Sequence, residues 1–303
     1  MPKRRAFLKP ARCLHLFSVS DVSTSVNYFS PAIRSLLLLL PVAMLLSGCD
    51  LQKDIDVELP ALPAQLVTEC YLEDGQIPRL TVTETTPYLA SPVPVLPTDV
   101  TVVLTLPSGR HDTLRFRPGI DSTILKGYTH IGSRPLVARP GDTFSLEVYD
   151  TKGRRVTGTA TMPDRIPIDS LRYKFNDKPT EERKAYLLTS FTDPAATADF
   201  YRLQIHKDSI STDRERDFEL DDRLNNGKSF TVGTSYQFRA GDTLLVTLYH
   251  IDQPYYLFRQ SVRDARDANG NPFAQPSAIR STVQGGVGVF TVLSYDRKQI
   301  ILR

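Results

Sequence analysis

An apolar run near the N-terminus, followed at once by two small residues and a cysteine, constrains this chain more than any other feature. The run Leu36–Leu46 has 11 residues and is interrupted only by Pro41. A helix that spans a bilayer needs about 20 apolar residues, whereas the apolar part of a signal peptide has about 7–15. A basic residue precedes the run, and Ser47 and Gly48 are small enough for a peptidase to reach the next bond. We therefore expect residues 1–48 to be a signal peptide. The alternative, an apolar core helix, does not explain the polar segment directly behind the run.

The residues around this cleavage point resemble a known processing motif. Leu46, Ser47, Gly48 and Cys49 occupy the four places of the lipobox of bacterial lipoproteins. The resemblance implies a diacylglyceryl thioether on the Cys49 sulfur and usually a further acyl chain, such as palmitate, on its amine. Two acyl chains hold a protein on a membrane stably. We expect no cofactor besides this covalent lipid.

Residues 49–64 are predicted to form a lipidated tether. Its prolines keep the chain extended, and its charged residues keep it solvated. Gln52, Lys53 and Asp54 resemble the short export signal of lipoproteins that are displayed on the surface of bacteria with Sus-type importers. An ordinary solvated tether contains the same residue types, so the alternative is a protein on the periplasmic leaflet. We expect a lipid anchor in the outer membrane, with the protein on the cell surface.

Cleavage changes the charge and the cysteine content of the chain. The signal peptide holds six Lys and Arg residues and one Asp, so the mature chain keeps 31 basic and 33 acidic residues, and the net charge falls from +3 to −2. This balance argues against nucleic acid as a partner, because nucleic-acid binding requires a basic surface. Cys13 leaves with the signal peptide and Cys49 is acylated, so Cys70 has no partner for a disulfide bond within the chain. Its position in an apolar run predicts a small buried side chain.

Short alternating segments separated by turns predict an all-β fold. Before an Asp-Gly turn, Leu66, Thr68, Cys70 and Leu72 alternate with Val67, Glu69, Tyr71 and Glu73, and Val100–Leu106 is the clearest strand. Residues 65–163 are therefore predicted to form an N-terminal β-sandwich, and residues 168–303 a second, β-rich domain. We expect two tandem antiparallel sandwiches of the immunoglobulin-like kind.

Two further patterns belong to the C-terminal half. The segment Arg239–Tyr249 parallels Arg139–Tyr149 at an offset of 100 residues, which predicts the same kind of hairpin in both halves. A single helix is predicted at 253–268, because Asp252 can cap it and Pro254 lies near its first position. Its aromatic residues at helical spacing favour core packing over a platform for an aromatic ligand.

No motif for catalysis or metal binding stands out. No two histidines of the mature chain have the spacing of a zinc-binding helix, and no G-x-S-x-G element occurs. The neighbours Asp221 and Asp222 are predicted to be solvated charges on a loop. We therefore expect no catalytic residue and no metal site, and the ligand-binding residues stay unknown. Two carboxylates from distant segments that meet in one cleft, as in glycosidases, are the arrangement that a sequence does not exclude.

Several segments resemble one family along the whole mature chain. They are Asp54–Pro60, Leu66–Glu69, Asn225–Phe230, Asn271–Phe273 and Gly286–Phe290. In this order they look like the domain-of-unknown-function 4249 family of bacterial outer-membrane lipoproteins. Cys70 stands where members often carry an aromatic residue, a difference that concerns local packing. The resemblance implies a lipoprotein often encoded beside a TonB-dependent outer-membrane receptor, with no catalytic residue to carry over.

These features together predict a non-enzymatic binding or accessory subunit of a TonB-dependent outer-membrane nutrient importer. Its expected partners are the outer membrane, through the lipid on Cys49, and such a receptor. The first alternative is a structural or adhesive module of the cell envelope, and the second is a hydrolase whose site is built on loops.

Overall fold

The computed structural model describes residues 63–303, apart from 88–92, 212, 270–274 and 276. All described residues belong to one compact unit, Ala61–Arg303. The predicted signal peptide, Cys49 and the Gln52-Lys53-Asp54 signal lie outside the described residues. Within the described part of the chain, no helix has both the length and the apolar character needed to cross a bilayer.

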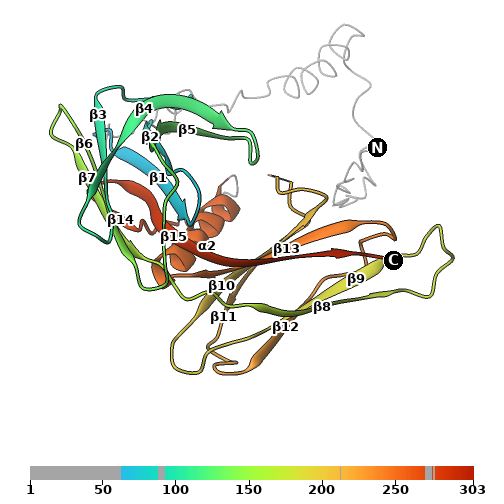
Figure 1. The fold of residues 1–303 in the computed structure, drawn as a ribbon. Coiled ribbons are helices and arrows are strands. Elements are labelled where there is room, and N and C mark those ends of the chain that lie inside the picture. Colours follow the sequence, from blue (N-terminus) through green and yellow to red (C-terminus); the bar gives the residue numbers. More distant parts are fainter. Residues whose placement is uncertain (1–62, 88–92, 212, 270–274, 276) are drawn as a thin grey trace, which may run out of the picture. The chain divides into compact units, whose positions relative to one another are not determined.

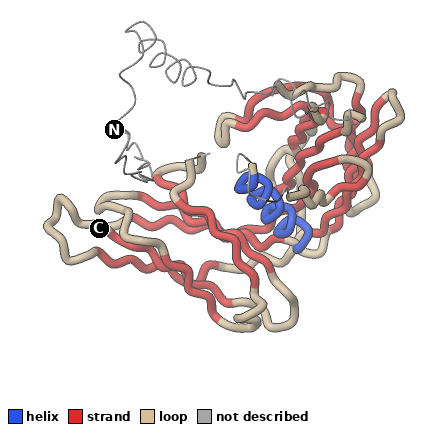
Figure 2. Tube along the Cα trace, turned by 180° about the vertical axis from the view of Figure 1, so that it is seen from behind, coloured by secondary structure: helices blue, strands red, loops and turns tan. Residues whose placement is uncertain are grey.

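The unit is built from strands and one described helix, which confirms the all-β class with a single helix (Figures 1 and 2). The strands of the N-terminal half are β1 (Leu66–Glu73), β2 (Arg79–Glu84), β3 (Val100–Thr105), β4 (His111–Asp121), β5 (Lys126–Ile131), β6 (Thr143–Asp150) and β7 (Arg155–Thr161). Those of the C-terminal half are β8 (Ile168–Phe175), β9 (Ala185–Thr192), β10 (Phe200–Lys207), β11 (Arg216–Asp221), β12 (Ser229–Gly233), β13 (Thr243–Ile251), β14 (Val283–Gln284) and β15 (Val287–Ile301). The helix is α2 (Gln253–Ala268).

The strands form one large sheet and one small sheet. The large sheet has twelve strands in the order β11-β10-β13-β15-β1-β2-β5-β4-β3-β6-β7-β14, and the small sheet has the order β12-β9-β8. Strict alternation explains why the strands form: in β1, Leu66, Thr68, Cys70 and Leu72 are buried while their neighbours are half-exposed. One buried core lies under the N-terminal strands, and a second lies under β8–β10 and β13.

The last strand, β15, belongs to both halves of the unit. Its residues Val287–Leu293 pair with β1 in parallel, and Ser294–Ile301 pair with β13 in antiparallel fashion. Phe290 and Val292 point into the N-terminal core, and β14 pairs with β7. Residues 283–293, which fall within the predicted C-terminal domain 168–303, therefore complete the N-terminal half.

The segment that joins the two halves is held to β15 by one carboxylate. Asp296 accepts a hydrogen bond from the Ile168 backbone N–H at 2.8 Å and pairs with Arg165. Burial alone raises the pKa of Asp296, but the bonds from Ile168 and Arg165 outweigh it and hold the pKa below its usual value. Between residues 163 and 168, where we expected a domain boundary, the chain passes from the large sheet to the small sheet. This segment is held at a fixed position on β15.

The two similar hairpins predicted from the 100-residue offset have the same turn. Gly141 and Gly241 both have positive φ, +84° and +89°. In each turn an Asp carboxylate, Asp142 or Asp242, accepts from the N–H of the arginine three residues earlier at 2.8 Å. The turns lead into β6 and β13, so the sequence similarity reflects a shared local structure.

Helix α2 has the predicted bounds. The Asp252 carboxylate caps it by accepting from the Tyr255 N–H at 2.7 Å. Tyr255, Tyr256 and Ser261 are its buried residues, and the two tyrosines pack with residues of β13 and β15. The aromatic side chains of Tyr255 and Tyr256 thus serve core packing.

We expect Gly288→Ala to lower the free energy of unfolding by at least about 3 kcal/mol, a loss typical of severe steric conflict. Gly288 pairs with Thr68 where β15 meets β1, has φ +134°, and a Cβ there would overlap the Thr68 carbonyl. The matched control is Gly109→Ala, which also has positive φ (+81°) but faces open space. The control should lose only about 1 kcal/mol. Urea unfolding measures both, and equal losses would contradict the assigned role of the β1–β15 contact.

Candidate functional site

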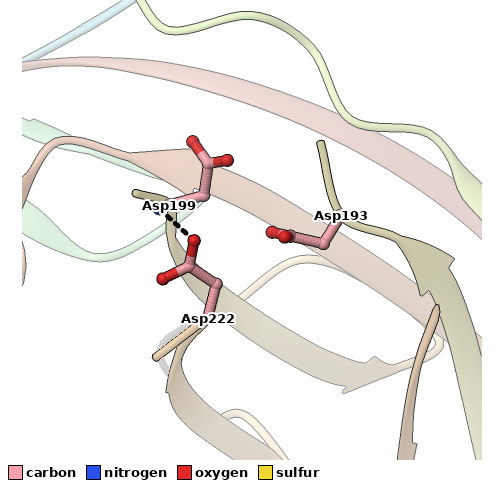
Figure 3. A group of neighbouring side chains, drawn as sticks. All are labelled: Asp193, Asp199 and Asp222. Carbon is pink, nitrogen blue, oxygen red and sulfur yellow. Dashed lines mark hydrogen bonds between the residues drawn. The ribbon is translucent and has the colours of Figure 1, made fainter. Parts of the chain in front are cut away.

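Three buried carboxylates lie together in the C-terminal half. Asp193 follows β9, Asp199 precedes β10 and Asp222 follows β11. One oxygen of each lies within 4.8 Å of the others, and each side chain is 3% exposed. Figure 3 shows the Asp193 carboxylate directed toward the other two. We refer to these three residues as the carboxylate cluster.

Backbone turns place the cluster. The N–H of Asp199 donates to the Asp222 carboxylate at 2.9 Å, which ties the start of β10 to the end of β11. The Gly227 N–H donates to Asp193 at 2.8 Å from a turn in which Gly227 has φ +71°. A Cβ at this position would collide with Ala195, so the turn needs glycine.

A histidine and a tyrosine complete the cluster. His250 Nε2 lies 2.9 Å from Asp199 Oδ1, and its Nδ1 lies 2.7 Å from the Asp164 carbonyl oxygen. Both oxygens only accept, so both contacts are hydrogen bonds when each ring nitrogen carries a proton. Tyr201 stacks on the His250 ring at a centroid distance of 5.3 Å and donates its hydroxyl proton to Asp193. Burial and this bond to Asp193 raise the pKa of Tyr201 far above its usual value.

Oxygen ligands of this kind suit Ca²⁺ and Mg²⁺, so the cluster is the candidate metal site of the described residues. Its oxygens, however, already accept protein hydrogen bonds. Asp193 accepts from Tyr201 and Gly227, and Asp199 accepts from His250 and Thr197. A cation would have to displace these donors. The geometry therefore fits a closed polar hub that joins the β9–β10 loop, the β11–β12 loop, the end of β13 and the segment before β8.

The same burial closes the cluster to a sugar substrate. Glycosidases need two carboxyl groups on either side of a bond in an open cleft. Here the side chains are 3% exposed, so a substrate has no access. The hydrolase alternative gains no support from these carboxylates.

The sequence pattern did not identify this hub. Asp222 was expected to be a solvated loop residue, and this expectation is wrong, because it is buried and accepts from Asp199. Asp199 and His250 are 51 positions apart, and no spacing rule connects them. The one local signal was the Asn225-Asn226-Gly227 turn, whose glycine bonds Asp193.

A second candidate site is an open groove beside β5, with a volume of about 610 Å³. This volume falls within the range of small-ligand pockets. Strand β5 pairs with β2 at only two positions, Ile131 and His130. The remaining residues of β5 separate from β2, and the groove lies where the two strands separate. Beyond that point the Thr129 hydroxyl takes the place of a backbone partner, accepting from the Val82 N–H at 2.9 Å. A bulge in β4 between Phe116 and Gly119 bends the opposite wall.

The groove is apolar with paired charges. Its lining includes Val67 and Glu69 of β1, Thr81 and Thr83 of β2, Leu96, Ile120 of β4, and Lys126 and Tyr128 of β5. The Lys126 ammonium pairs with Glu69 and lies 4.4 Å from the centre of the Tyr71 ring. Because these charges neutralise each other, the groove suits an uncharged group with an apolar face.

The comparisons with known proteins give a family and no activity. A family model described as "Domain of unknown function (DUF4249)" matches residues 52–299. No curated protein matches the chain. Among solved structures, one titled "Cytokine receptor complex - Crystal form 1A" is 8% identical, covering 78% of this chain and 95% of that one, with a TM-score of 0.24. A pullulanase complexed with maltotriose from Anoxybacillus sp. LM18-11 is 14% identical, covering 60% of this chain and 24% of that one, with a TM-score of 0.19. Structural scores this low carry no argument about function.

We expect Asp193→Ala to lower the free energy of unfolding by about 2–3 kcal/mol, because the buried Tyr201 hydroxyl and Gly227 N–H lose their acceptor. Asp193→Asn keeps one acceptor oxygen and should cost less. The matched control is Asp169→Ala, which removes an acceptor from an exposed bond to Thr192 and should change stability by less than about 0.5 kcal/mol. Denaturant unfolding of the three variants provides the comparison, and an Asp193→Ala protein as stable as the control would refute the hub.

We expect millimolar Ca²⁺ to leave the melting temperature unchanged, since the carboxylate oxygens are occupied by protein donors. A ligand that binds the folded state raises the melting temperature. Thermal unfolding with Ca²⁺ and with a chelator makes the measurement. An increase with Ca²⁺ that Asp222→Asn abolishes would show that the cluster is a metal site instead.

Proposed function

The chain belongs to the DUF4249 family, and from that premise we propose that it is a cell-envelope lipoprotein that serves as a non-enzymatic accessory subunit of an outer-membrane importer. The observation that carries the proposal is the sequence Leu46-Ser47-Gly48-Cys49 behind an 11-residue apolar run. A lipid on Cys49 would leave a short tether before the compact unit, which starts at Ala61. The unit would then stay close to the membrane.

The open groove supports a role in binding. It combines an apolar lining with a few hydroxyl groups, as sites for small ligands commonly do. We propose that it receives an uncharged part of the imported substrate or of the receptor. A subunit that captures a substrate and then passes it to an importer must bind that substrate with modest affinity. A groove without an unpaired charge fits that requirement.

The finer architecture that we propose for the unit is two sandwich halves of immunoglobulin-like size with β15 in common. Two separate buried cores support it. The equivalent turns at Gly141 and Gly241, 100 residues apart, support it as well.

The alternative that deserves a direct comparison is a structural or adhesive module of the envelope. The lipid anchor and the β-rich unit suit that role equally. The two functions differ in their partners: an accessory subunit co-purifies with a transporter, whereas an adhesive module polymerises or binds a host surface.

We expect Cys49→Ala to abolish incorporation of labelled palmitate and to remove the mature protein from the outer-membrane fraction. The matched control is Cys70→Ala, which should keep the label, because Cys70 is buried in the N-terminal core. Metabolic labelling and membrane fractionation are the measurements. A mature-sized Cys49→Ala protein in the outer membrane would overturn the lipoprotein assignment.

The receptor partner needs its own experiment. Affinity purification of the lipidated protein from detergent-solubilised outer membranes should recover a TonB-dependent receptor. Recovery of the protein with no such receptor would reject the accessory role while leaving the lipid anchor intact.

A further inference from the structure

We propose that the tip of the β4–β5 hairpin is a second membrane contact, which rests on the anionic headgroups and the outer acyl region of the lipid surface. The inference relies on the proposed lipid anchor at Cys49 to keep the hairpin near the membrane. Figures 1 and 2 show the hairpin projecting from the sheet toward its turn. The turn comprises residues 122–125, between Asp121 and Lys126.

The hairpin exposes several large apolar side chains near this turn. Ile120 is 70% exposed and Leu125 is 71% exposed. Ile124 and Phe116 are partly exposed on the same hairpin. Apolar side chains this accessible gain about 25 cal/mol per Å² when they leave water, so their concentration on one projecting element favours an apolar partner.

Leu125 also has a strained backbone. Its φ is +48°, in the left-handed region. Leu125 is one of only two non-glycine residues with positive φ among the described residues. A leucine there costs about 1–2 kcal/mol, which Gly or Asn would largely avoid. The exposed side chain has little packing in the isolated unit to offset this cost. Strained backbone of this kind is typical of contact sites.

The charges of the hairpin indicate an anionic surface. Its two carboxylates are already paired, Asp112 with Arg110 and Asp121 with Arg79. Arg115 and Arg117 are exposed, and neither pairs with a carboxylate of the described residues. An element that combines exposed apolar side chains with unpaired arginines complements the anionic headgroups and apolar interior of a bilayer.

The tether allows this contact. Ala64 lies 15 positions after Cys49, and its carbonyl is held by Arg154 at 3.0 Å. A fully extended chain of this length spans at most about 50 Å, so Ala64, at the start of the unit that carries the hairpin, stays within about 5 nm of the lipid. A tethered group has a high effective concentration at its target, so a few side chains are enough for a populated contact.

The experiment uses the mature lipidated protein in vesicles of phosphatidylethanolamine and phosphatidylglycerol. Thr123→Cys carries a fluorophore at the turn, and Ser108→Cys carries it in the β3–β4 turn as a reference. Cys70 does not compete for the label, because burial raises the pKa of its thiol to about 12. We expect lipids with a quencher in the acyl chain to quench the fluorophore at position 123 and not at position 108.

Leu125→Gly tests the contact without damaging the fold. It should raise the melting temperature, because glycine relieves the strain, and it should abolish the quenching at position 123. The matched control is Leu224→Gly, which removes another exposed leucine (88%) outside the hairpin and should leave the quenching unchanged. Replacing Arg115 and Arg117 with glutamine should weaken the quenching in these vesicles, and the effect should disappear in high salt.

The outcomes separate this inference from the proposed function. If the protein floats with the vesicles but the two fluorophores behave alike, or if Leu125→Gly leaves the quenching unchanged, the membrane contact is refuted. If Leu125→Gly instead abolishes recovery of a receptor while the quenching persists, the hairpin binds protein and the inference is likewise overturned. A protein that does not float with vesicles at all contradicts the lipid anchor itself.

Discussion

The pairing of β15 with two different neighbours is the constraint on which the rest of the unit depends. Its first half pairs with β1 of the N-terminal half, and its second half pairs with β13 of the C-terminal half, so β15 joins the two parts of the twelve-stranded sheet. Gly288 makes the close approach to Thr68 feasible, because any side chain there would meet the backbone of β1. Phe290 and Val292 then fill the first core from the far end of the chain. Neither half is complete without this strand.

Hydrogen bonds at the polar hub and at the segment between the halves also link distant parts of the unit. Asp296 on β15 holds Ile168, and His250 on β13 holds the Asp164 carbonyl. Ile168, Asp296 and His250 are buried, so each bond that is lost leaves a buried group without a partner, which is costly in a protein interior. The residues between β7 and β8 are therefore a fixed connection, unlike the flexible linker that joins independent domains. The carboxylate cluster is best understood as part of this connection.

Local signals were enough for much of the fold. The alternation of Leu66–Leu72 predicted β1, and the Asp252 cap with Pro254 predicted the bounds of α2. The strand β11 was missed because its charged residues interrupt the apolar pattern. In the structure Asp217 pairs with Arg202, and Glu219 pairs with Arg259 of α2, so the charges are satisfied by distant partners. The membership of 283–293 in the N-terminal half was missed for a different reason: the pairing of β15 with β1, which is far away in the sequence, leaves no trace in local periodicity. The hub is assembled from four separate segments, and the lipidation motif is the one site feature that neighbouring residues alone define.

The position of β15 in the chain has a consequence for biogenesis. Among the described strands, the one that completes the first core comes last in the chain, and its partner β1 comes first. A parallel pair between the two ends of a sequence has a high contact order, and such pairs form late and slowly. The edge of β1 that pairs with β15 therefore remains open during synthesis until residues 287–293 arrive. The pairing of residues 287–293 with β1 is thus the step that completes the first core, whatever part of the unit has folded before it.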